Sequence, residues 1–67
     1  MEENQVKVVA QVNVNKDGFQ SVRQIPTFFV NAYCFVTAKS IVKDIFKGQN
    51  MSGQMEDSKG YMKNFNF

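Results

Sequence analysis

Hydrophobic and polar residues alternate along the first part of the chain. Every second residue from position 6 to position 14 is apolar, namely Val6, Val8, Ala10, Val12 and Val14. This period is typical of a strand with one buried face. Residues 15–18 read Asn-Lys-Asp-Gly, and Asp-Gly supplies the positive backbone dihedral angles of a tight turn. The pattern therefore predicts a β-hairpin whose first strand covers about Gln5 to Val14.

The second strand of this hairpin begins near Phe19 and has a less regular pattern. Pro26 lacks the backbone N–H that a strand ladder needs, so it marks an edge position, a bulge or a break. Residues 27–32 continue as extended chain, rich in aromatic and β-branched side chains. Either one long strand is kinked at Pro26, or a third short strand starts there. We favour the kinked strand, because residues 24–26 lack the Gly, Asn or Asp that a second tight turn prefers.

An amphipathic helix is predicted from Phe35 onward. Its apolar positions recur at spacings of three and four residues, and they are Phe35, Ala38, Ile41, Val42, Ile45 and Phe46. Such a stripe is typical of a helix with one face on a small sheet. Lys47 suits the negative end of the helix dipole, and Gly48 is placed to end the helix in a left-handed cap. Asn31 or Thr37 could cap its start.

The rest of the chain divides into a polar and an apolar part. Residues 49–60 are polar and punctuated by glycine, which predicts a loop or linker. Residues 61–67 form an aromatic C-terminal segment and are a candidate strand. We therefore expect a hairpin-plus-helix domain over residues 1–48. The expected fold class is α+β in the order β-β-α, with the helix stripe packed on the valine face of the hairpin.

The size of the chain limits how it can be stabilised. A domain of 67 residues buries only about 60% of the surface that its unfolded form exposes, so its core is marginal. A disulfide, a metal or a partner chain usually compensates. Cys34 is the single cysteine and the chain has no histidine, which excludes an internal disulfide and a zinc site of cysteine and histidine. We expect no cofactor and no metal, and we infer self-association or folding against a partner.

Charge and targeting signals are weak. The net charge of +2 does not by itself indicate a polyanionic partner, because nonspecific nucleic-acid binders use clustered Lys and Arg. No apolar run approaches the roughly 20 residues of a membrane span. The first five residues are acidic where a secretory signal is basic and then apolar. The single thiol fits a reducing compartment. We expect a cytoplasmic protein without a membrane partner.

The chain lacks the usual combinations of catalytic residues. Without histidine, nucleophilic catalysis by serine or cysteine has no imidazole base. The glycines do not cluster as in a phosphate-binding loop. The carboxylates, including the adjoining Glu56 and Asp57, are interpreted as solvated surface groups. Cys34 would be activated in the first turn of the helix, but we favour a small buried hydrophobe at the joint between strand and helix. We expect no enzyme activity.

Basic residues offer an alternative function. Lys39, Lys43 and Lys47 lie four residues apart, on one edge of the predicted helix, where a row of lysines can follow phosphates. With Arg23 they form the candidate nucleic-acid site. An ordinary solvated helix face explains such a row more often, and Asp44 beside it weakens the positive field. The aromatic residues that could stack on bases are Phe19, Phe29, Tyr33 and Tyr61.

One part of the chain resembles a layout in small uncharacterised bacteriophage proteins. Residues 27–32, followed by Ala38 and then Ile41-Val42, read as an extended strand that runs into an amphipathic helix through an alanine-containing joint. The resemblance covers about half the chain and its motif is short. The chain departs from that layout at Cys34, where a serine or a similar cap is expected. The resemblance implies a phage or mobile-element product that binds a host or phage macromolecule.

The leading hypothesis is a non-catalytic interaction module that binds another protein and itself. The expected partner-binding residues are Phe29, Tyr33, Tyr61, Phe65 and Phe67. An unpaired edge at the second strand, or at the kink after Pro26, is expected to carry homo-oligomer contacts. Residues 61–67 are expected to bind or assemble while the hairpin and helix fold without them. The alternative is a nucleic-acid-binding accessory protein, and salt separates the two, because phosphate binding weakens as salt rises.

Overall fold

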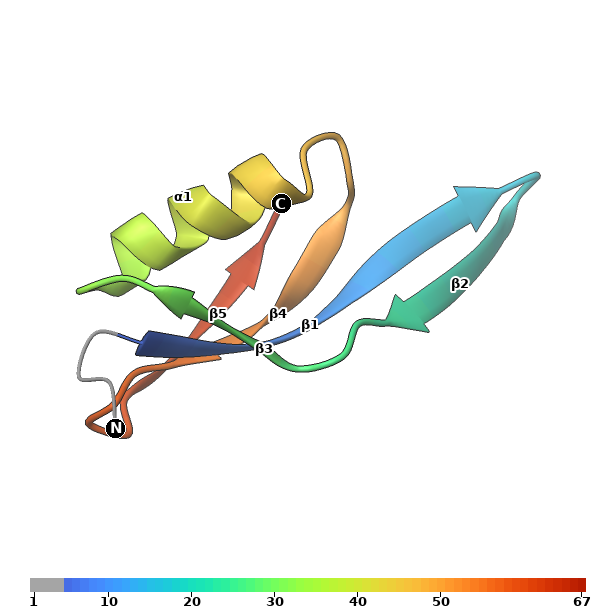
Figure 1. The fold of residues 1–67 in the computed structure, drawn as a ribbon. Helices are drawn as coiled ribbons and strands as arrows, with labels where there is room; N and C mark the ends of the chain where they lie inside the picture. The colour runs from blue at the N-terminus through green and yellow to red at the C-terminus, as the bar shows by residue number, and fades with distance from the viewer. Residues whose placement is uncertain (1–4) are drawn as a thin grey trace.

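The computed structural model describes residues 5–67 as one antiparallel sheet with a helix on one face (Figure 1). The strands are β1 (Gln5–Lys16), β2 (Phe19–Gln24), β3 (Phe28–Asn31), β4 (Met51–Glu56) and β5 (Met62–Asn66), and the helix is α1 (Phe35–Ile45). The order across the sheet is β2-β1-β4-β5, and β3 also pairs with β1. The described part of the chain is therefore a two-layer α+β structure in which the strands predominate.

The predicted β-β-α arrangement is wrong, because the sheet has five strands and its centre includes β4. Residues 49–60 were expected as a loop or linker, yet Met51–Glu56 pairs with β1 on one side and β5 on the other. The glycine and polar residues of this segment interrupt the apolar alternation by which a strand is recognised in the sequence. In an extended chain, Met51, Gly53 and Met55 face the same side, and both methionines are buried there. Residues 1–48 alone would leave the second edge of β1 unpaired.

The turn between β1 and β2 is confirmed. Asp17 and Gly18 have φ angles of 53° and 82°, the left-handed values that a two-residue hairpin turn requires. Lys16 pairs with Phe19 across it. The strand that leads into this turn is longer than predicted, since β1 runs to Lys16 rather than to Val14.

The favoured single kinked strand is wrong, because a separate third strand, β3, follows Pro26, and both β2 and β3 pair along one edge of β1. Gln24 lies opposite Gln11 and Phe28 lies opposite Val8. The chain thus uses residues 25–27 where β1 uses only residues 9 and 10, which is a one-residue bulge. The Ile25 N–H still donates to the Ala10 carbonyl at 3.1 Å. The missing N–H of Pro26 therefore falls where the ladder is interrupted, and it divides the expected kinked strand into β2 and β3.

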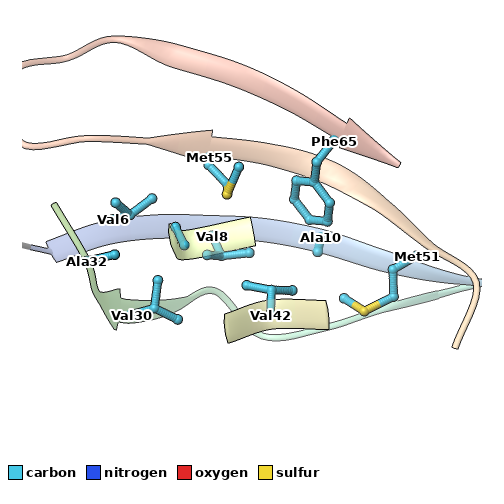
Figure 2. Close-up of a cluster of buried hydrophobic side chains, with 10 residues drawn as sticks. Val6, Val8, Ala10, Val30, Ala32, Val42, Met51, Met55 and Phe65 are labelled. Carbon is cyan, nitrogen blue, oxygen red and sulfur yellow. The ribbon is translucent and has the colours of Figure 1, made fainter. Parts of the chain in front are cut away.

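The core lies between α1 and the sheet (Figure 2). The buried apolar residues are Val6, Val8, Ala10, Val30, Ala32, Ala38, Val42, Met51, Met55 and Phe65. Burying a side chain such as Val8 or Val42 contributes about 1.5 to 3 kcal/mol. The valine face of β1 was predicted to be buried throughout. It is buried only as far as Ala10, because Val12 is half-buried and Val14 is exposed.

The ends of α1 follow the prediction only in part. Gly48 has the predicted left-handed φ of 83°, but the helix ends earlier, at Ile45 with Phe46 as its cap, so Gly48 and Lys47 belong to the turn that follows. At the start, neither Asn31 nor Thr37 is the cap. Cys34 occupies that position in an extended conformation.

Gly53 marks the closest approach of β4 to β1. A Cβ at this position would clash with the Val9 carbonyl oxygen and would lie 2.7 Å from the Ala10 Cα. Gly53 pairs with Ala10 on one side and with Phe65 on the other. Figure 2 shows the Phe65 ring directed toward Ala10. Glycine thus lets β4 lie close against the backbone of β1.

Candidate interaction sites

The end of the β1–β2 hairpin projects beyond the rest of the molecule (Figure 1). The pairing of β1 with β4 stops at Val12, opposite Met51, and only β2 continues alongside. We call the projecting part, residues 13–22, the arm. It accounts for the elongated shape, which measures 43 × 19 × 16 Å. All six residues of β2 are exposed, so the arm has no second layer on either face.

The outer edge of β2 is open for hydrogen bonding. A two-residue turn makes Lys16 and Phe19 a hydrogen-bonded pair, and such pairs alternate along an antiparallel ladder. The backbone groups of Gln20, Val22 and Gln24 therefore point away from β1. Charged residues and prolines usually protect such an edge. Within β2 the single charged residue is Arg23, and Pro26 comes after its end.

The arm also exposes apolar side chains. Phe19 is 79% exposed and Val22 is 54% exposed. Alternation places Val14, Phe19 and Ser21 on the face of the arm that continues the helix side of the sheet. Val22 lies on the opposite face. Sequence reasoning named Phe19 only as a base-stacking candidate, although the irregular pattern of the second strand already indicated that neither face of it is buried.

The sheet face opposite α1 is mixed, because alternation places on it the charged Lys7 and Glu56 and the exposed apolar Val9, Phe29 and Met62 among amides and hydroxyls. The side chains there include Gln11, Asn13 and Ser52 from neighbouring strands. The Gln11 amide donates to Asn13 at 3.4 Å, and the Asn13 amide donates to the Ser52 hydroxyl at 3.3 Å. Amides and hydroxyls of this kind remain favourable in water. Like the arm, this face exposes apolar side chains among polar ones.

The predicted partner-binding residues divide into exposed and buried groups. Phe29, Tyr33 and Tyr61 are 58%, 86% and 67% exposed, respectively. They come from β3, from the loop before α1 and from the loop before β5, so the structure does not gather them on one element. Phe65 is buried and Phe67 is half-buried, with their ring centroids 5.2 Å apart. Both rings therefore pack on their own chain, and their role in partner binding stays a prediction.

The predicted basic residues are separated as well. Arg23 lies on β2 at the base of the arm, opposite Val12 and so on the helix side of the sheet, but it lines neither of the grooves that the lysines of α1 line. Lys39 and Lys43 line a groove of about 360 Å³ between α1 and β5, and Lys63 of β5 joins them there. Lys47 lines a different groove with Lys43. Sequence reasoning missed Lys63, because its position depends on the unpredicted pairing of β4 with β5.

Cys34 is exposed, so its interpretation as a small buried hydrophobe is wrong. It precedes the first turn of α1, and its sulfur lies 3.4 Å from the Thr37 hydroxyl. This hydrogen bond, aided by the backbone N–H groups of Thr37 and Val36, lowers the pKa of the Cys34 thiol. At a given pH, more of Cys34 is therefore in the thiolate form that alkylating reagents attack than for an ordinary cysteine.

The carboxylates have structural or solvated positions. Asp57 accepts backbone N–H bonds from Lys59 and Tyr61, both at 2.9 Å, and so shapes the turn between β4 and β5. Within residues 5–67, no group of three His, Cys, Asp or Glu side chains is arranged to hold a metal ion. A bilayer-spanning helix is absent from the same residues, whose single helix has 11 residues.

Comparisons of the chain with protein-family models, with curated proteins and with solved structures returned no match. The resemblance to small bacteriophage proteins therefore stays a prediction, and inferences about function rest on the geometry of the arm and of the lysine groove.

Proposed function

We propose that the protein is a non-catalytic interaction module that binds other protein chains by extending its sheet at β2, and that its first partner is a second copy of itself. The observation that carries this proposal is the arm, a two-stranded ribbon that is exposed on both faces and on its outer edge. A hairpin of this kind is only marginally stable in water without further layers or strands.

A second copy fits the edge of β2 by symmetry. Two antiparallel copies of one strand pair around a twofold axis perpendicular to the sheet, and opposite residues then share a face. With the axis at Ser21, Phe19 lies opposite Arg23 of the second copy, where ring and guanidinium attract each other. Arg23 does not face its own copy, so no like charges oppose each other. The paired arms would form one continuous sheet.

Other protein partners would use the same edge. An extended peptide gains affinity from main-chain hydrogen bonds and specificity from alternate side chains when it joins a sheet. The exposed Phe19 and Val22 supply the apolar contacts on the two faces. The outer strand β5 differs from β2 in that Lys63 is near the middle of the strand, and a charged residue usually protects a strand edge.

Light scattering over a micromolar to millimolar concentration series tests the proposal. We expect a mass of about twice the 7.7 kDa of the chain. Val22→Lys introduces a charge on the edge of β2 and should return the monomer mass. Val36→Lys is the matched control, because Val36 is also an exposed valine but lies on α1. It should leave the dimer intact.

Circular dichroism of both variants checks that the sheet and helix remain folded, as expected for exposed positions. A wild-type protein that stays at the monomer mass across the whole series would overturn self-association. Equal dissociation by Val22→Lys and Val36→Lys would show that the contact does not lie at the edge of β2.

A further inference from the structure

We propose that the groove between α1 and β5 binds the phosphate backbone of a single-stranded nucleic acid. The site goes beyond the proposed protein-binding function, because it lies in the body of the molecule and shares no residue with the arm. It also differs from the basic site expected from the sequence, since it excludes Arg23 and Lys47 and includes Lys63.

The groove brings together lysines from two elements. Lys39 and Lys43 are one helical turn apart on α1, a rise of about 6 Å. Lys63 lies on β5 opposite Met55, and so points to the helix side of the sheet. All three line the same hollow. A row on the helix alone resembles any solvated face, whereas cations on both walls create a positive channel.

The positive charge of the groove has no counterpart in the lining. The other polar residues there are Ser40 and Asn64, and among residues 5–67 no acidic side chain lines it. Asp44, which the sequence placed beside the lysine row, lies instead in the neighbouring groove with Lys47. Lys39 also lies 6.0 Å from the centroid of the Phe67 ring, a contact that holds its ammonium group over the C-terminal strand. The site is therefore arranged for an anion.

Apolar side chains beside the lysines favour a single strand. Phe35 and Val36 line the groove, and Val36 is 76% exposed. Bases of a single strand present open faces that stack on aromatic and apolar surfaces, whereas a duplex hides them. Tyr33, 86% exposed and two residues before α1, adds a ring at the same end of the helix. The lysines would therefore bind the phosphates, and the apolar side chains would stack with the bases.

Fluorescence anisotropy with a fluorescein-labelled oligothymidylate tests the site. The experiment uses the full chain at about 50 and about 200 mM salt, because phosphate binding depends steeply on salt. The test variant carries Lys39→Gln, Lys43→Gln and Lys63→Gln. The matched control carries Lys7→Gln, Lys16→Gln and Lys59→Gln, which removes the same charge from outside the groove.

We expect the groove variant to bind at least about tenfold more weakly and to lower the slope of log affinity against log salt by about 2, as for three lost single-strand phosphate contacts. The control should retain most of the affinity. Absence of wild-type binding at low salt, or equal loss in both variants, would overturn the site. Equal affinity for the annealed duplex or for polyglutamate would overturn its assignment to single strands. Val22→Lys should still bind the probe, which separates this site from the arm.

Discussion

The two halves of β1 carry the same alternation of valines but lie in opposite surroundings. Val6 and Val8 are buried, with 1% and 0% of their surface exposed, while Val14 on the same face is 37% exposed. The first half has β3 on one side, β4 on the other and α1 above it. Beyond Asn13, whose N–H donates to the Asn50 carbonyl, the strand has only β2 beside it. Alternation therefore fixes which side chains share a face, and neighbouring elements decide whether that face is buried.

This difference separates two parts of the molecule. The described residues outside the arm, which we call the body, stabilise the fold, and the arm is available for contact. In the body, the close-packed groups come from positions far apart in the chain, such as Val8 and Met55. In the arm, every cross-strand pair closes through the same turn. Changes in the body should therefore alter the free energy of unfolding, and changes in the arm should alter association instead.

The largest effect is expected from Val42→Asp at the centre of the body. Val42 is fully buried, and an unpaired charge there costs several kcal/mol. The whole domain is stable by roughly 3 to 10 kcal/mol at the usual value per residue. We expect loss of the far-UV circular dichroism of the folded state. Lys43→Gln, one residue along on the exposed side of α1, is the control. If Val42→Asp melted at the same temperature as the wild-type protein, Val42 would not lie on the buried face of α1.

Phe65→Ala is expected to have the next largest effect. Removing a buried aromatic side chain costs about 3 to 5 kcal/mol, and Phe65 is 5% exposed. Urea unfolding should show the decrease in the free energy of unfolding. Deletion of residues 61–67 should be at least as severe, contrary to the expectation that the hairpin and helix fold without this segment. Tyr61→Ala, at a position 67% exposed, should change stability little.

A matched pair of substitutions tests the comparison within β1 itself. Val8→Ala should destabilise the protein by about 1.5 to 3 kcal/mol, because it removes buried methyl groups and leaves a cavity in the core. Val14→Ala, on the same face of the same strand, should cost at most about 0.5 kcal/mol in a monomeric variant such as Val22→Lys. Both are measured by urea unfolding. Equal costs would mean that the arm is covered within a single chain.

The smallest effect is expected at the start of α1, where the body has an exposed reactive group. Thr37→Ala removes the hydrogen bond that lowers the pKa of Cys34, so the thiol should titrate at higher pH. The rate of alkylation by iodoacetamide against pH measures this shift. The melting temperature should stay unchanged, because both side chains are exposed. An unchanged rate profile would show that the Thr37 hydroxyl does not act on the thiolate.

The sequence predicted elements with strong local signals. The alternation of β1, the Asp17-Gly18 turn and the spacing of Ala38 and Val42 were read correctly, because each depends on neighbouring positions. The central strand β4 was missed, since Gly53 reads as a loop residue and is needed only where the strand passes close to Val9. The lysine groove depends on that missed strand, because β5 joins the sheet through β4.

The position of β4 beside β1 has a consequence for the order of folding. The β1–β2 hairpin closes through a local turn, and such hairpins form in about 1 to 10 μs. The pairing of Lys7 with Glu56 joins positions near opposite ends of the chain, and contacts of this kind slow folding. The arm therefore closes repeatedly before β4 pairs with β1, although it is only marginally stable until then. The second edge of β1 stays open throughout that interval, so a crowded population of nascent chains can pair at the wrong edge before the native neighbour arrives.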